Sequence, residues 1–195
     1  MTPITVFIHH RKKRHPSRGE WRALVKEVIE SVTDSPVDLL FDGLGRPYIN
    51  HPNVSISYAH TKDAIALALA QGSVEIGLDA EDASRIDEIQ EIRESAFSHK
   101  EQYPTTTDLV SNWCLKEAAV KMYGRGFHDH NPVEVVMSTK NSLFSARVRN
   151  NEIAKGYFEV VKEGSLIMAI CSDRRFSLHI KYWDEPVGIG AKDDA

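Results

Sequence analysis

Residues 112–124, NWCLKEAAVKMYG, carry a carboxylate and two ammonium groups on one predicted helix. At about 100° per residue, one stripe of roughly 140° holds the polar side chains Trp113, Lys116, Glu117 and Lys121. Glu117 and Lys121 are four residues apart, so they could form a solvated pair that contributes only a few tenths of a kcal/mol. The alternative is that the stripe faces a ligand, and the rest of the chain must decide between the two.

Two further carboxylates are predicted at the end of a strand, in residues 74–82, VEIGLDAED. Apolar and polar positions alternate there, which points one set of side chains into a core and carries Asp79 and Glu81 on the opposite face. Two carboxylates this close repel each other unless a cation lies between them, and oxygen ligands combined with substrate phosphates suit Mg²⁺. A solvated strand end is the other interpretation of this segment.

Candidate phosphate donors precede these acids in the chain. Arg46 lies in a Gly-Arg-Pro turn, and His60 and Thr61 follow a predicted strand. Guanidinium, imidazole and hydroxyl groups donate hydrogen bonds to phosphate oxygens, although each of these residues alone is as easily a solvated or structural side chain. Together with the acids and the lysines, they describe a site for a phosphorylated ligand and its metal ion.

Charge is unevenly distributed along the chain. The net charge is −4, but residues 1–22 hold six Lys or Arg against one Glu, which leaves about −9 for the remainder. Such a basic segment favours a polyanion, either nucleic acid or a small ligand with several phosphates, unless it is a solvated loop.

The composition is that of a globular protein of 195 residues, with 42% apolar and 27% charged residues. No apolar run approaches the ~20 residues of a membrane span, and the N-terminal charges follow the apolar stretch, which is the reverse of a secretory signal. We therefore expect a cytoplasmic protein with no membrane partner. Cys114 and Cys171 fall within helical and strand patterns, which predicts buried thiols rather than a disulfide or a nucleophile.

Hydrophobic periodicity predicts helices and strands in alternating groups. Helices are expected at residues 19–32, 85–96 and 108–123. Strands are expected at residues 3–9, 53–59, 63–70, 73–80, 133–137, 143–149, 156–163, 165–172 and 175–182. Residues 32–38 and 41–48 are rich in turn formers and are predicted to be connectors. The HDH sequence at 128–130 is predicted to lie in a loop rather than to bind a metal.

Two segments of the chain resemble each other weakly. Residues 63–81 and 165–183 each contain an apolar strand, a polar turn and a second strand. Repetition of such a unit indicates two related halves.

The order of these motifs is similar to that of the 4'-phosphopantetheinyl transferases, which load the phosphopantetheine arm of coenzyme A onto carrier proteins. The matching elements are GRP (45–47), SYAHT (57–61), IGLDAE (76–81), FSHKE (97–101) and WCLKEAAVK (113–121). The last resembles the family pattern Trp-x-x-Lys-Glu-Ala-x-x-Lys and is the most specific. The chain is too long for the small trimeric holo-acyl-carrier-protein synthase type, so it resembles the surfactin-synthetase-activating type, a monomer of two similar halves.

This resemblance implies an α+β fold of two similar halves, each a small, mostly antiparallel sheet packed on a long helix. The halves are expected at residues 1–83 and 84–184, followed by a polar C-terminal tail at 185–195. One site is expected between the halves, and the protein is expected to be a monomer.

The resemblance also assigns roles to individual residues. Asp79, Glu81 and Glu117 would hold Mg²⁺ or Mn²⁺ against the pyrophosphate of coenzyme A, the co-substrate. Glu117 would take the proton of the carrier protein's serine, directly or through a water, while Lys116 and Lys121 would neutralise the phosphates. Residues expected to bind coenzyme A are Arg46, His60, Thr61, Asp79, Lys116, Lys121 and, by a looser match, Arg14 and Arg18.

Two positions depart from the family pattern. Ala59 stands where a serine usually precedes His60, and Arg46 replaces the usual lysine, which keeps the charge but changes the geometry. Neither change removes a metal ligand, so activity toward an apo acyl or peptidyl carrier protein is expected. Trp113 is expected to pack between the halves with no chemical role.

Two other functions stay open at this point. One is a degenerate homologue that binds carrier protein or coenzyme A without catalysis, against which the complete set of acids and lysines argues. The other is a nucleic-acid binder that uses the basic N-terminal arm. The acidic chain and the lack of a basic strand interleaved with aromatic residues argue against nucleic acid as a partner.

Overall fold

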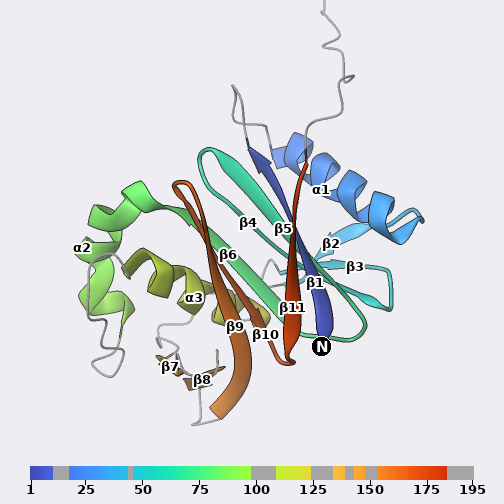
Figure 1. The fold of residues 1–195 in the computed structure, drawn as a ribbon. Helices are drawn as coiled ribbons and strands as arrows, with labels where there is room; N and C mark the ends of the chain where they lie inside the picture. Colours follow the sequence, from blue (N-terminus) through green and yellow to red (C-terminus); the bar gives the residue numbers. More distant parts are fainter. Residues whose placement is uncertain are drawn as a thin grey trace, which may run out of the picture.

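The computed structural model of the protein describes residues 1–10, 18–43, 46–97, 109–123, 134–138, 143–147 and 153–183. The fold is α+β, as predicted (Figure 1). In chain order the elements are β1 (Thr2–His10), α1 (Arg18–Thr33), β2 (Leu39–Phe41), β3 (Pro47–Ile49), β4 (Val54–His60), β5 (Ala64–Gln71), β6 (Ile76–Asp82), the 3₁₀ turn η1 (Ala83–Arg85), α2 (Ile86–Ala96), α3 (Leu109–Met122), β7 (Glu134–Ser138), β8 (Leu143–Arg147), β9 (Ile153–Glu163), β10 (Leu166–Ser172) and β11 (Phe176–Tyr182).

Every helix and strand expected from the periodicity has a counterpart in the structure. The structure also contains two strands that were not predicted, β2 and β3, which form a short antiparallel pair in a region that was expected to be a connector. Strands of three residues are too short to show an alternating pattern, so turn-forming residues dominate the signal there. The HDH sequence, residues 98–101 of the FSHKE element and the tail at 185–195 lie outside the described residues.

The strands form a four-stranded sheet, β11-β1-β5-β4, a five-stranded sheet, β6-β10-β9-β8-β7, and the β2-β3 pair. All neighbouring strands that are described pair in antiparallel fashion except β1 and β11, which are parallel. β6, from the expected first half, pairs in the second sheet, and β11, from the expected second half, pairs in the first. The two segments that resemble each other, β5-β6 and β10-β11, therefore cross between the sheets in opposite directions.

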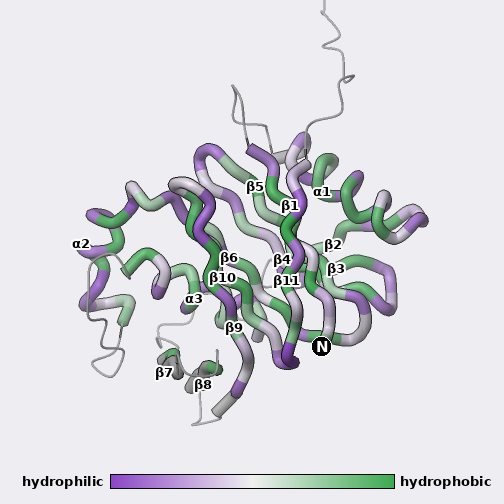
Figure 2. The backbone as a smooth tube through the Cα atoms, viewed as in Figure 1, coloured by the Kyte–Doolittle hydropathy of each residue, from purple (hydrophilic) through white to green (hydrophobic). Residues whose placement is uncertain are grey.

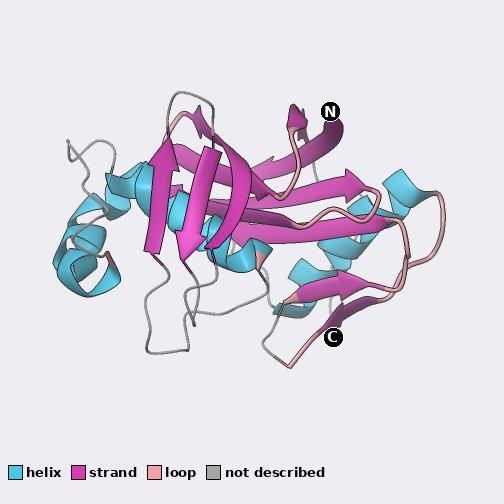
Figure 3. Ribbon diagram, turned by 90° about the horizontal axis from the view of Figure 1, so that it is seen from below, coloured by secondary structure: helices cyan, strands magenta, loops and turns pink. Residues whose placement is uncertain are grey.

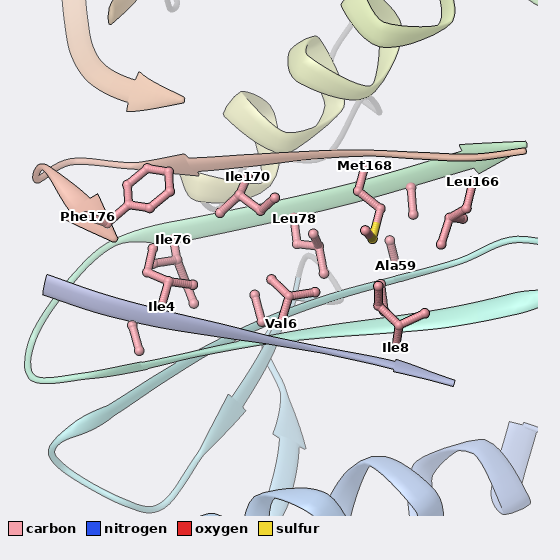
Figure 4. Close-up of a cluster of buried hydrophobic side chains, with 14 of the residues drawn as sticks. Ile4, Val6, Ile8, Ala59, Ile76, Leu78, Leu166, Met168, Ile170 and Phe176 are labelled. Atoms are coloured by element: carbon pink, nitrogen blue, oxygen red, sulfur yellow. The ribbon is translucent and has the colours of Figure 1, made fainter. Parts of the chain in front are cut away.

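A hydrophobic cluster fills the space between the two sheets (Figure 4). Its buried members include Ile4, Val6, Ile8, Ile76, Leu78, Leu166, Met168 and Ile170. From β5 only alanines face this cluster, namely Ala64, Ala66, Ala68 and Ala70. These small side chains leave room for the larger ones opposite, and Figure 2 shows the hydrophobic residues concentrated where these central strands face each other.

One helix covers the outer face of each sheet. Trp21, Val25 and Ile29 of α1 pack against alternate residues of β5, such as Ile65 and Leu67, which point away from the alanine face. On the other side, α3 packs across the five-stranded sheet, with α2 at that end of the molecule (Figure 3). The order of layers is thus α1, four-stranded sheet, five-stranded sheet and α3.

The two cysteines lie in the contact between α3 and β10. Cys114 and Cys171 are buried free thiols, as predicted. Burial raises the pKa of both thiols well above its ordinary value, so neither is a thiolate at neutral pH. Separately, none of the described helices is both long and apolar enough to span a membrane.

Gly77 allows α3 to lie directly on β6. A Cβ atom at this position would stand 1.9 Å from the carbonyl oxygen of Ala118 and 2.6 Å from the amide nitrogen of Met122. Both are backbone atoms of α3, so no side-chain rotation could relieve the overlap. Only glycine permits this approach of the helix to the strand.

We predict that Gly77→Ala lowers the free energy of unfolding by about 3 kcal/mol or more, because the added methyl group would force α3 away from the sheet. Urea denaturation measures the effect. Gly43→Ala is the matched control, since a Cβ atom there meets nothing within 4 Å, and it should stay within about 0.5 kcal/mol of wild type. A Gly77→Ala midpoint equal to that of wild type would contradict the close contact.

Candidate active site

The acids of β6 and the polar residues of α3 meet where the helix crosses the strand. Asp79 and Glu81 follow Gly77 on the face of β6 that α3 covers, and Glu117 precedes Ala118, whose carbonyl group contacts Gly77. The two motifs therefore lie side by side in the structure. The strand end is not solvated, because only 5% of the surface of Asp79 is exposed.

Only one of the two carboxylate oxygens of Asp79 accepts a hydrogen bond from a described neighbour. The ammonium group of Lys121 donates to Asp79 Oδ1 at 2.7 Å, and this lysine keeps 34% of its side chain exposed. Asp79 Oδ2 is buried and has no hydrogen-bond partner among the residues that the structure describes. The ion pair that sequence spacing suggested for Lys121 was with Glu117, but the ammonium group contacts the strand instead.

Glu81 is held by a residue that sequence analysis did not select. Arg85 Nη1 donates to both carboxylate oxygens of Glu81, at 2.6 and 2.7 Å, and the indole N–H of Trp113 donates to Oε1 at 3.3 Å. Burial and the nearby Asp79 still raise the pKa of Glu81, against the lowering effect of Arg85. Glu81 and Arg85 are four residues apart, a spacing that predicts an ion pair when both residues lie in one helix. Here the ion pair connects a strand to a 3₁₀ turn, so the spacing did not predict it.

Glu117 has the most perturbed carboxyl group of the site. Burial, followed by repulsion from Asp79, raises its pKa to about 8 against the opposing attraction of Lys121. The group is therefore able to hold or release a proton near neutral pH, which is the property of a general base or acid. With all three carboxylates ionised, the two cations Lys121 and Arg85 would leave one negative charge unbalanced.

Lys116, a predicted phosphate contact, has its described contacts at the end of α2. Its side chain is fully buried, and its ammonium group donates to the carbonyl oxygen of Ala96 at the end of α2. The same ammonium group lies 5.0 Å from the centre of the Phe97 ring. Lys116 lies at one edge of the predicted polar stripe, where α2 packs on α3, and its ammonium group stabilises that helix end.

Trp113 also differs from its predicted place. Its ring packs edge-to-face on Phe97, with the centroids 5.9 Å apart, inside the cluster that joins α3 to the five-stranded sheet. It therefore does not separate the two halves, and its indole N–H helps to orient Glu81.

The proposed phosphate donors lie at the end of β4, for His60 and Thr61, and just before β3, for Arg46, and they have contacts of their own. His60 packs edge-to-face on Trp21 of α1, and Thr61 Oγ1 accepts hydrogen bonds from the amides of Asp63 and Ala64, so it caps a turn. Arg46 donates to Glu75 Oε2 at 2.5 Å.

Glu75 and Asp79 are four residues apart along one extended segment, a separation of roughly 13 Å. The guanidinium group of Arg46 is thus paired with an acid remote from the acid cluster. Arg14 lies outside the described residues, and Arg18 begins α1 with a side chain that is not described.

The acid cluster has donors suited to a metal ion but not a completed centre. Among the described residues, no three His, Cys, Asp or Glu side chains are arranged to hold a metal ion. The contacts explain this, because Arg85 engages both oxygens of Glu81 and Lys121 engages one oxygen of Asp79. The buried, unpartnered Asp79 Oδ2 and an all-carboxylate donor set nevertheless fit a hard divalent cation such as Mg²⁺.

The comparison with known protein families gives a match to the part of the chain that contains this cluster. The family model described as the 4'-phosphopantetheinyl transferase superfamily matches residues 75–171, which run from the start of the β6 segment into β10. The GRP and SYAHT elements lie before the matched range. No curated protein matches the chain.

We predict that metal-free protein loses stability as pH rises from 4.5 to about 8. The unfolded chain releases the Glu117 proton near the ordinary pKa of 4.5, whereas the folded protein retains it up to a pKa of about 8. Folding therefore requires proton uptake in this window, and the free energy of unfolding falls with pH. Melting temperatures of wild type and Glu117→Gln should be similar at the acidic end, and the variant should be the more stable at the alkaline end. Parallel curves for the two proteins would contradict the raised pKa.

The pair between Lys121 and Asp79 should also matter for folding. Lys121→Met keeps the aliphatic chain but leaves a buried carboxylate without its counter-charge, so we expect a loss of about 2 kcal/mol in chemical denaturation. The same change in an Asp79→Asn background should cost less than half as much. Lys26→Met is the control, because its 3.6 Å contact with Glu30 is a surface pair worth about 0.5 kcal/mol or less.

Proposed function

We propose that this protein, whose residues 75–171 match the family model of the 4'-phosphopantetheinyl transferase superfamily, transfers the 4'-phosphopantetheine arm of coenzyme A to a serine of an apo acyl or peptidyl carrier protein, with release of 3',5'-ADP. The observation that carries the proposal is the meeting of Asp79 of β6 with Glu117 and Lys121 of α3, inside the matched region. Acids of this kind together with an ammonium group suit the pyrophosphate of a nucleotide and its cation.

In the proposed site, Asp79 and Glu117 hold a Mg²⁺ or Mn²⁺ ion, with Glu81 as the third ligand. The unpartnered Oδ2 of Asp79 supports its role, and the raised pKa of Glu117, caused first by burial and then by repulsion from Asp79, supports the role of Glu117. When bound, the cation would withdraw charge from the pyrophosphate and help to align it for attack.

Glu117 is the proposed general base. Its carboxylate accepts the proton of the carrier serine hydroxyl, directly or through one water, while the serine oxygen attacks the β-phosphate of coenzyme A. Before a cation binds, burial and repulsion from Asp79 raise the pKa of this carboxyl group to about 8, close to a physiological pH.

Lys121 is proposed to stabilise the phosphate charge that grows as the bond to 3',5'-ADP breaks. Its ammonium group is anchored on Asp79, yet one third of the side chain remains exposed, so it can contact a ligand without leaving the strand. Such a fixed cation acts by electrostatic preorganisation, since it is already in place before the charge develops.

His60, Thr61 and Arg46 are proposed contacts of coenzyme A on the first half of the protein, and Arg14 and Arg18 extend this set less securely. For Arg46 the proposal requires a change of partner, because its guanidinium group must leave Glu75 to reach a phosphate. We further propose a monomeric, cytoplasmic enzyme, with the carrier protein and coenzyme A as its partners.

The test incubates the protein with an apo carrier protein, coenzyme A and Mg²⁺ and follows the carrier by intact mass spectrometry. We expect a gain of one phosphopantetheine, lost when the divalent cation is chelated. Asp79→Ala and Glu117→Ala should each lower the rate by about 10² or more, because each removes a proposed cation ligand and Glu117 is also the base. Glu27→Ala, on the exposed side of α1, is the control and should retain the wild-type rate.

Other outcomes separate the alternatives. Binding of coenzyme A without any gain in carrier mass, across carriers of fatty-acid, polyketide and peptide synthesis, would indicate the degenerate homologue. Near-normal transfer by Asp79→Ala, with an intact circular dichroism spectrum, would overturn the proposed cation site.

A further inference from the structure

Arg85 places a guanidinium group against the carboxylate that is proposed as the third cation ligand. It contacts both oxygens of Glu81 through one nitrogen, at 2.6 and 2.7 Å. The Glu81 side chain is only 12% exposed, whereas that of Arg85 is 41% exposed. A cation that approaches from solvent therefore finds the oxygens of Glu81 already engaged by a positive charge.

Arg85 also has a second anchor, on the outside of the protein. Its Nε donates to Glu88 Oε2 at 2.8 Å, and Glu88 lies in the first turn of α2 with 68% of its side chain exposed. The guanidinium group thus bridges a buried acid and a solvent-facing acid. If it leaves Glu81, it retains Glu88 as a partner, so the release does not strand a charge.

The charges of the cluster change in a simple way with this release. Three ionised carboxylates with Lys121 and Arg85 carry a net charge of −1, and the same group without Arg85 carries −2, which one divalent ion balances. With Arg85 in place, Glu81 is neutralised, while the buried Asp79 Oδ2 has no hydrogen-bond partner among the described residues. Lys121 and Arg85 therefore balance the negative charge of the three carboxylates only in part.

We propose that Arg85 is an internal cation that competes with the divalent metal ion for Glu81. In this proposal, Glu81 joins the cation site only when the guanidinium group moves outward to Glu88, and the affinity for metal is set by the competition. Arg85 then acts as a positioning residue, which determines whether the site has two or three carboxylate ligands. The inference rests on the cation site of the proposed function, but its test does not require enzymatic turnover.

The test measures Mn²⁺ binding to the purified full-length protein by isothermal titration calorimetry. Arg85→Gln should bind Mn²⁺ about tenfold or more tightly than wild type, because a competing charge within a few ångströms has been removed. Arg85→Lys, which keeps the charge but loses the planar fork, should lie between the two. Arg93→Gln removes the same charge from the last turn of α2 and should stay within about twofold of wild type.

Melting temperatures give a second reading of the same proteins. Without metal, Arg85→Gln should melt below wild type, since Glu81 then faces Asp79 with no guanidinium group. Added Mn²⁺ should raise its melting temperature more than that of wild type. If Arg85 only braces the turn after β6, the variant would be destabilised with no gain in Mn²⁺ affinity.

The outcomes distinguish this inference from the proposed function. If wild type binds Mn²⁺, Asp79→Asn loses that binding and Arg85→Gln binds no more tightly than wild type, the cation site stands and the competition is overturned. If Asp79→Asn binds Mn²⁺ as wild type does, or no protein binds it, both the cation site and the role of Arg85 are overturned. Should Arg85→Gln fail to fold by circular dichroism, the intermediate affinity expected of Arg85→Lys decides, and equality with wild type would count against the proposal.

Discussion

The contact of α3 with the backbone of β6 at Gly77 is the constraint on which the site depends. A strand residue with any side chain would hold the helix away, since the position of its Cβ lies 1.9 Å from the Ala118 carbonyl oxygen. The contact also determines register, because Asp79 follows Gly77 by two residues and Glu117 immediately precedes Ala118. Acids from segments far apart in the chain are thereby brought into one small, mostly buried volume.

Burying several carboxylates in that volume carries an electrostatic cost that the protein meets only in part. Lys121 and Arg85 each neutralise one acid, yet the pKa of Glu117 remains raised to about 8 and one oxygen of Asp79 has no partner. A structural ion-pair network would be expected to satisfy its buried members. The remaining charge and the unpartnered Asp79 Oδ2 support the proposed cation site.

The two sheets are joined by more than their shared core. The β5-β6 and β10-β11 segments each pass from one sheet to the other, and Ser57 of β4 accepts a hydrogen bond from the amide of Leu78 on β6 at 2.8 Å. The first sheet, which carries His60, is thus tied to the strand that carries the acids. The halves expected from the sequence place β6 in the first half and α3 in the second. In the folded protein, β6 is a strand of the five-stranded sheet, and α3 packs on that sheet.

The sequence by itself determined the elements and the chemistry of the acids. Alternation in β6 and the helical spacing of α3 were enough to select Asp79, Glu81, Glu117 and Lys121, because periodicity reports which side chains share a face. Only the tertiary structure decided which partners these side chains take. Lys116, on the same polar stripe, is buried by α2, and Arg85 enters the cluster from a turn, since both outcomes depend on how separate elements pack. Spacing along one element carries no information about such contacts.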